Sequence, residues 1–252
     1  MSSLEVLPWP EVDHAHFGPV TVQPLSRVQG YVAAHLSRNW VRIPHVTHND
    51  QADITDLGSF RKQLQRECGQ AITALPFLVK AAVAALKAFP QFNASLDASG
   101  KHLVLKQYFH IGIAVDTPNG LLVPVIRDAD QKTIVEIATE LAAVSEQART
   151  KGLSMAQMSG GCFSISSLGS IGGTSFTPII NAPEVAILGV TRSHDVLVRS
   201  ADGQGEWRTF LPLSLSYDHR VINGADAARF CRHLAISLSQ PADLAGQSTA
   251  PA

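Results

Sequence analysis

The sequence contains few cysteines and no excess of either charge. Cys68, Cys162 and Cys231 are widely spaced and form no CxxC pair, so neither a zinc site nor a disulfide framework is expected, and a reducing cytoplasm fits best. The 20 basic and 21 acidic residues give a formal net charge of −1, whereas a nucleic-acid-binding domain needs a clearly basic surface. We therefore expect neither a metal nor a nucleic-acid partner.

The sequence also lacks segments typical of export or membrane insertion. The N-terminal stretch MSSLEVLPWPEVDH carries acidic residues where a signal peptide needs basic and apolar ones. The longest apolar stretch, roughly residues 74–89, is interrupted by Pro76, Lys80 and Lys87, and it is too short to span a bilayer. Secretion and a membrane location are therefore not expected.

Several motifs of common enzyme classes are missing. There is no G-x-x-x-x-G-K-[ST] loop and no G-x-G-x-x-G fingerprint, so nucleoside triphosphates and dinucleotides are not implied. The absence of G-x-S-x-G makes a serine hydrolase a poor alternative. His45 and His48 follow Pro44 in an extended segment that points them to opposite faces, so the pair does not suggest zinc.

The composition and the order of patterns predict one α/β domain. Hydrophobic residues make up 45% and charged residues 16%, which suits a large core and large buried contacts. Residues 1–20 carry three prolines and are expected to be an extended arm or a linker remnant, and residues 241–252 a disordered tail. Between them, residues 21–240 mix hairpin and crossover patterns, which favours a mixed β-sheet flanked by helices.

Local signals place the expected elements along this domain. Helices are expected from Ser26 to about residue 40, from Thr55 or Asp56 to residue 68, over 75–90 as a largely buried helix, over 133–150 and over 224–238. Strands are expected in IPHVTHNDQADI, CFSISSLG, EVAILGVT and WRTFLPLSLSYDHR, together with a hairpin around Pro118-Asn119-Gly120.

The segment SLSYDHRVINGADAARF holds the first candidate catalytic residue. It predicts a strand that ends at Asp218-His219-Arg220, then a short turn and a helix. A histidine held at a strand end suits a general base, because a neutral imidazole accepts a proton from a thiol near pH 7. A structural histidine is the more common reading of such a residue. Asn223 is equally open, since it caps the following helix well and its amide could also hold the turn or bond an oxyanion.

A second segment, GGCFSISSLGSIGGTSFTPIINAPEVAILGV, places hydroxyls at a strand end. Ser166 and Ser167 run into Gly169, Gly172 and Gly173, which allow close backbone approach. A serine there could donate a hydrogen bond to an oxyanion. A hydroxyl-rich strand followed by a flexible turn is the plainer interpretation.

Together these segments give the chain a family resemblance. With HIGIAVDTPNGLLVPVIRD and IPHVTHNDQADIT, they resemble in order the catalytic domain of the E2 acyltransferases of 2-oxo acid dehydrogenase complexes, over about residues 19–238. The resemblance implies a chloramphenicol acetyltransferase-like fold and acyl transfer between lipoyl-lysine and coenzyme A. It also implies that His219 takes the thiol proton and that Ser167 donates to the oxyanion, with Ser166 as the alternative one position away.

The motif departs from the wider superfamily pattern HHxxxDG. Here it reads Asp218-His219 with Asn223-Gly224, so an electrostatic role at residue 223 is in doubt while a hydrogen-bonding role survives. Asp218, Arg220 or the backbone must then orient His219. No metal is required by this chemistry.

The resemblance also implies partners and an acyl group. It favours acetyl as in pyruvate-type enzymes, with acetoin, branched-chain or succinyl relatives as alternatives. It implies homotrimers that assemble into a larger shell, such as a 24-subunit cube, in a bacterial cytoplasm. The E1 and E3 dehydrogenase subunits, and the lipoyl-lysine itself, would be reached through domains not recognisable in this sequence. A mainly structural assembly core is the alternative of a different class.

Overall fold

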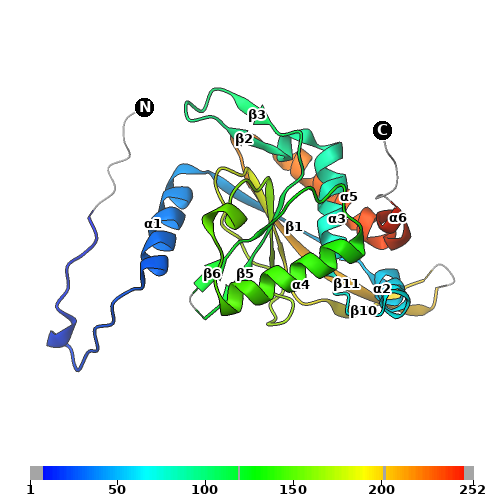
Figure 1. Ribbon diagram of the computed structural model, residues 1–252, viewed down its shortest axis with the longest axis horizontal. Helices are drawn as coiled ribbons and strands as arrows, with labels where there is room; N and C mark the ends of the chain where they lie inside the picture. The colour runs from blue at the N-terminus through cyan, green and yellow to red at the C-terminus, as the bar shows by residue number, and fades with distance from the viewer. Residues whose placement is uncertain (1–7, 119, 201–202, 247–252) are drawn as a thin grey trace.

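The computed structural model describes residues 8–118, 120–200 and 203–246. A seven-stranded mixed sheet in the order β1-β11-β9-β8-β4-β7, with β10 pairing β11, runs through the middle of the molecule (Figure 1). Its strands are β1 (His45–Asp53), β4 (Ile111–Ile113), β7 (Val125–Ile126), β8 (Phe163–Ser167), β9 (Ala186–Val190), β10 (His194–Arg199) and β11 (Gly205–Asp218). β8 pairs in parallel with β4 and β9, and the remaining pairs are antiparallel. The expected mixed sheet is confirmed.

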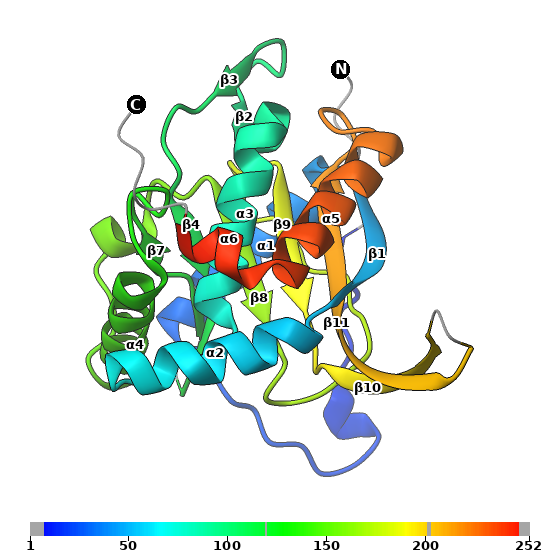
Figure 2. The ribbon, with the colours of Figure 1, turned by 90° about the vertical axis from the view of Figure 1, so that its right-hand side faces the viewer.

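Helices cover one face of this sheet, as Figure 2 shows. They are α2 (Thr55–Cys68), α3 (Leu75–Ala88), α4 (Ile134–Thr150), α5 (Gly224–Ser239) and α6 (Pro241–Gly246). The apolar helix α3 is almost wholly buried, as its composition predicts. Phe92 stacks on Phe230 with ring centroids 4.1 Å apart, and both side chains are fully buried. The main core therefore lies between the sheet and these helices.

The opposite face of the sheet carries small and polar side chains beside a small apolar cluster of Ile43, Ile180 and Ile187. Side chains alternate along β8, so that Phe163 and Ile165 join the main core while Ser164 points to the other face. At Gly189 an added Cβ would lie 2.6 Å from the Phe176 ring, so only glycine lets the 169–183 segment pack this closely.

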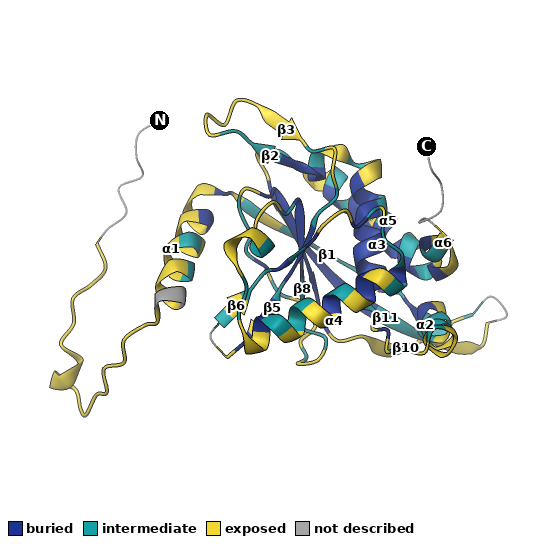
Figure 3. Ribbon diagram, viewed as in Figure 1, coloured by how far each residue is buried: buried dark blue, intermediate teal, exposed yellow. Residues whose placement is uncertain are grey.

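The N-terminal region lies apart from the body. Residues 8–26 are exposed throughout. The one regular element among them is the short turn η1 (His14–His16). They lead into α1 (Arg27–Arg42), which begins with the Ser26 capping box. Figure 3 shows α1 as largely exposed, and Tyr31, Trp40 and Val41 stay open to solvent. Among the described residues, no other segment of the same chain covers this apolar surface.

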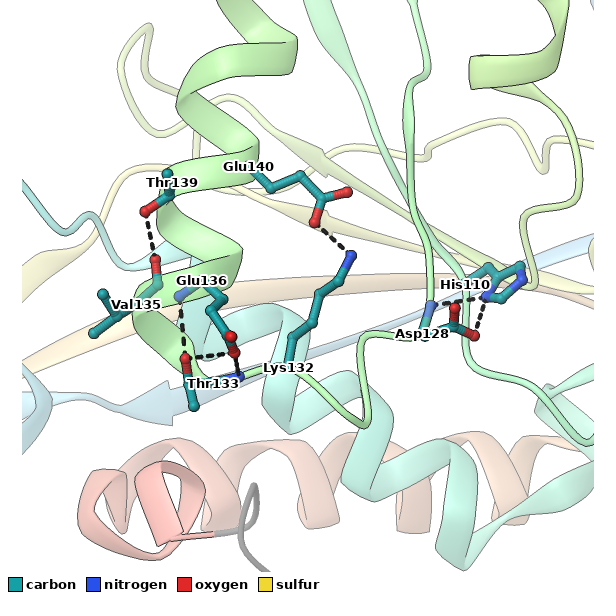
Figure 4. A network of polar contacts seen from close by, with 8 residues as sticks. All are labelled: His110, Asp128, Lys132, Thr133, Val135, Glu136, Thr139 and Glu140. Carbon is teal, nitrogen blue, oxygen red and sulfur yellow. Dashed lines mark hydrogen bonds and ion pairs between the residues drawn. The ribbon is translucent and has the colours of Figure 1, made fainter.

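The loop before α4 is tied down by local polar contacts (Figure 4). Asp128 has a positive φ of 48°, and its N–H donates to His110 Nδ1 at 3.0 Å. Thr133 and Glu136 form the capping box that starts α4 at the expected place. Lys80 reaches the same loop from α3 and donates to the carbonyl of Lys132 at 2.9 Å. The helix start is thus fixed by sequence-local bonds and one buried lysine.

Two small hairpins complete the fold. β2 (Ala94–Leu96) pairs with β3 (Leu103–Leu105), after the turn η2 (Pro90–Phe92). β5 (Val115–Thr117) pairs with β6 (Gly120–Leu122) around the predicted turn, whose Asn119 lies outside the described residues. The turn η3 (Met155–Met158) precedes β8. In the described ranges, no helix combines the length and apolarity needed to cross a membrane.

Two expectations about element ends are wrong. The N-cap of α2 is Ile54, which makes no side-chain bond, because Thr55 instead donates to Asp53 and accepts from the N–H of Thr209. The disordered tail does not begin at residue 241, since Pro241–Gly246 form α6. Pro241 and Leu244 are buried there against the neighbouring helices, which stabilises a helix too short to be recognised from its pattern.

Candidate active site

His219 stands in a turn that backbone bonds hold from two sides. β11 ends at the preceding residue, and the N–H of His219 donates to the carbonyl of Pro44 at 3.1 Å. The N–H of Asp218 donates to the carbonyl of Val185 at 2.8 Å. The imidazole is exposed, with the Tyr217 ring centroid 5.9 Å away. A rigid backbone therefore presents an accessible histidine.

Asp218 and Arg220 bind one another rather than the imidazole. Asp218 is buried, and its carboxyl accepts from the Nε, Nη2 and backbone N–H of Arg220. This pairing raises the pKa of Arg220 above its usual value through the hydrogen bond to Asp218. Within the described part of the chain, the His219 ring forms no hydrogen bond, so its backbone is what fixes its position.

Asn223 acts as the N-cap of α5. Its Oδ1 accepts from the N–H of Asp226 at 2.9 Å, and its Nδ2 donates to Asp226 Oδ2 at 2.8 Å. The predicted capping role is present in the structure. The residue is exposed four positions after His219, on the far side of the same turn.

Ser167 ends β8 and is exposed, whereas Ser166 is half-buried. Neither hydroxyl bonds to another described residue, so each is available as a donor. Behind Ser167, Gly172 and Gly173 have φ values of 140° and 88°, left-handed conformations that favour glycine. The strand-end hydroxyl and the glycine turn thus occur together, as the sequence predicts.

One chain holds His219 and Ser167 at opposite ends of the sheet. Ser167 pairs with Val190, and Val190 pairs with Leu213 of β11. His219 lies six positions further along that strand, which at about 3.3 Å per residue separates the two by about 20 Å along the strand direction alone. A single chain therefore cannot bring the two side chains to one reacting atom.

The same fold and motifs occur in a known family. Residues 17–245 match the model of the 2-oxoacid dehydrogenases acyltransferase family, catalytic domain. The chain belongs to this family. The resemblance noted in the sequence is confirmed for nearly the whole acyltransferase domain.

Relatives of this acyltransferase domain are found among bacterial enzymes. The dihydrolipoyllysine-residue acetyltransferase component of the pyruvate dehydrogenase complex is 58% identical over 230 residues in Cupriavidus necator and 54% identical over 231 in Pseudomonas aeruginosa. These matches cover 90% of this chain but only 41% and 42% of the relatives. The chain thus spans less than half the length of these two relatives.

Solved structures match the acyltransferase domain equally well. One is Azotobacter vinelandii dihydrolipoamide acetyltransferase, studied for the roles of one serine, one histidine and one asparagine in its catalytic mechanism. It matches with a TM-score of 0.90 and 49% identity, covering 95% of this chain and 99% of that one. The cubic core of a pyruvate dehydrogenase multienzyme complex matches with a TM-score of 0.90 and 50% identity, with the same coverage of both chains. Chloramphenicol acetyltransferase, with a TM-score of 0.55 and 14% identity, shares the fold.

The structure adds residues around the histidine turn that the motifs do not reveal. His45 donates from Nδ1 to the carbonyl of Ile43 at 2.8 Å and accepts at Nε2 from the N–H of Ile180 at 3.0 Å. Glu184 is buried, and its Oε1 accepts from Ser164 at 3.0 Å. Burial raises the pKa of Glu184 to about 7. In the sequence, Glu184 is the one acidic residue in the apolar run NAPEVAILGV, and this contrast could have singled it out as a candidate.

Proposed function

We propose that this chain is the catalytic core of a dihydrolipoyllysine-residue acetyltransferase, which moves an acetyl group between lipoyl-lysine and coenzyme A. The observation that carries the proposal is the exposed His219, held by backbone bonds in its turn, within a chain closely similar to acetyltransferases of pyruvate dehydrogenase complexes. The lipoyl-lysine would be carried by a separate domain, and coenzyme A would be a substrate.

The chemistry needs few groups. As the thiol sulfur bonds to the acetyl carbon, His219 takes the thiol proton, and it returns the proton to the departing sulfur when the old thioester bond breaks. Ser167 donates a hydrogen bond to the acetyl carbonyl oxygen, which becomes negatively charged in the tetrahedral intermediate between these two steps. Removing such a donor typically slows a reaction by about 10²–10³-fold. One thioester replaces another, so excluding water matters more than supplying free energy.

The assignment of Ser167 rather than Ser166 has positional support. In the Azotobacter enzyme, the studied serine and histidine are separated by the same interval as Ser167 and His219. The studied histidine and asparagine are separated by the same interval as His219 and Asn223. Counting from Ser166 would make the first interval one residue too long.

The wide separation of His219 and Ser167 supports a site shared between subunits. We propose a homotrimer in which the histidine of one chain faces the serine of its neighbour, an arrangement that head-to-tail contacts in a cyclic trimer allow. The exposed apolar side chains of α1 and of the preceding arm are available for such contacts. Assembly of trimers into a 24-subunit cube would follow the cubic core that this chain resembles. E1 and E3 subunits would associate through other domains, in the cytoplasm of a bacterium.

A thioester-exchange assay with acetyl-CoA and free dihydrolipoamide tests the function. The wild-type chain should transfer acetyl, and His219→Ala should abolish transfer while leaving assembly unchanged in light scattering. A correctly assembled mutant within tenfold of wild type would reject the base assignment. Succinyl-CoA and isobutyryl-CoA in the same assay distinguish the acyl group, and an inactive wild-type assembly would favour a structural core instead.

A further inference from the structure

Glu184 is a buried acid that makes only half of the bonds available to it. Its Oε1 accepts from Ser164 Oγ at 3.0 Å and from Asn181 Nδ2 at 3.4 Å, whereas its Oε2 is buried and has no partner among the described residues. Burying an unpaired polar atom costs stability that a small apolar residue would avoid. A residue that carries this cost invites a functional explanation.

The surroundings of this acid are closely fitted. A Cβ added to Gly161 would lie 2.8 Å from Glu184 Oε1, so the carboxyl packs directly on that glycine. The ionisable groups near it are Lys106, which donates to the carbonyl of Gly161 at 3.3 Å, and Cys162. Neither of them makes a hydrogen bond to the carboxyl. The side chain is therefore held in one place chiefly by Ser164 and Asn181.

Glu184 belongs to a loop that lies beyond the β-ladder. The pairing of β9 with β8 starts at Ile187 opposite Ser164, and the pairing of β9 with β11 ends at Ala186 opposite Tyr217. Residues 181–185 are therefore not positioned by strand pairing. The Glu184–Ser164 bond ties this loop to β8.

The same loop supports the histidine turn at two points. The carbonyl of Val185 accepts from the N–H of Asp218, directly before His219. At the other end, the N–H of Ile180 donates to His45, whose neighbour Pro44 accepts from the N–H of His219. A shift of the loop would move both supports, and small misplacements of catalytic groups cost large factors in rate.

We propose that Glu184 is a positioning residue for His219, acting through Ser164 and the 180–185 loop. This inference rests on the proposed acetyl transfer. The hydrogen bond from Ser164 to the carboxyl fixes the loop, and the loop carbonyl of Val185 fixes the turn. Glu184 is buried inside the chain, so its loss should lower the rate of the chemical step and leave substrate affinity unchanged.

Steady-state kinetics on assembled variants test this role. Glu184→Ala and Ser164→Ala should each lower kcat at least tenfold, with KM for acetyl-CoA and dihydrolipoamide within twofold of wild type. The double variant should be no slower than the slower single one, because both changes break the same link. Glu184→Gln keeps an oxygen for Ser164 and Asn181 and should stay within threefold of wild type.

A matched control separates positioning from general loss of stability. Lys80→Met removes a buried ammonium on the helical face of the sheet, which donates to the carbonyls of Ala129, Asp130 and Lys132. Losing these bonds should lower the unfolding midpoint without changing kcat per assembled chain. If Ser164→Ala assembles and its kcat stays within twofold of wild type, the inference is overturned. This holds even if Glu184→Ala fails to fold. Multiplying effects in the double variant would overturn it as well. An inactive wild type would reject the proposed function, and the inference with it.

Discussion

At the scale of single residues, Glu184 should make stability depend on pH. Its pKa is about 7 in the folded chain because burial disfavours the charged carboxylate, against 4.5 for an exposed glutamate. Between these values the unfolded chain releases a proton that the folded chain retains. The contribution of Glu184 to the unfolding free energy should therefore be most favourable below pH 4.5. It should fall as the pH rises towards 7 and change little above pH 7.

The replacement Glu184→Gln removes this titration and keeps the shape. The difference in unfolding free energy between variant and wild type should thus grow in favour of the variant between about pH 4.5 and 7, by on the order of 3 kcal/mol. Chemical denaturation at a series of pH values measures it. A difference that stays constant with pH would show that the folded-state pKa is ordinary.

At the scale of one element, α5 depends on its first residue. Asn223 bonds the N–H of Asp226, and aspartate caps helices about as well, so Asn223→Asp should keep the fold and much of the activity. Asn223→Leu should lose a cap worth about 1 kcal/mol and any contact to the reacting groups. Thermal unfolding and the exchange assay measure the two losses separately. A fully active leucine variant would leave Asn223 with a capping role alone.

At the scale of the whole molecule, the sheet predicts a shared active site. His219→Ala and Ser167→Ala should each be nearly inactive alone. In co-expressed mixed trimers, roughly a quarter of the interfaces should join an intact histidine to an intact serine, given head-to-tail contacts, and activity should return to about that fraction. Exchange activity in trimers verified by mass spectrometry measures this. No recovery in verified mixed trimers would reject the shared site.

The sequence by itself determined those features that depend on bonds between near neighbours. The capping boxes at Ser26 and Thr133 and the cap at Asn223 join residues three apart, so α1, α4 and α5 begin where the pattern predicts. The apolar composition of α3 likewise foretold its burial. The family motifs lie in such locally determined segments, which is why they could be read without coordinates.

Only the tertiary structure decided what depends on strand order and packing. Thr55 failed as a cap because distant β11 offered its hydroxyl another partner, and α6 forms because Leu244 finds a buried site. The bond between Glu184 and Ser164 spans twenty residues, and no local pattern encodes it. The separation of His219 from Ser167 follows from the register of three paired strands. Such long-range pairings are set by the packing of the whole chain, so they cannot be derived from residues that are adjacent in sequence.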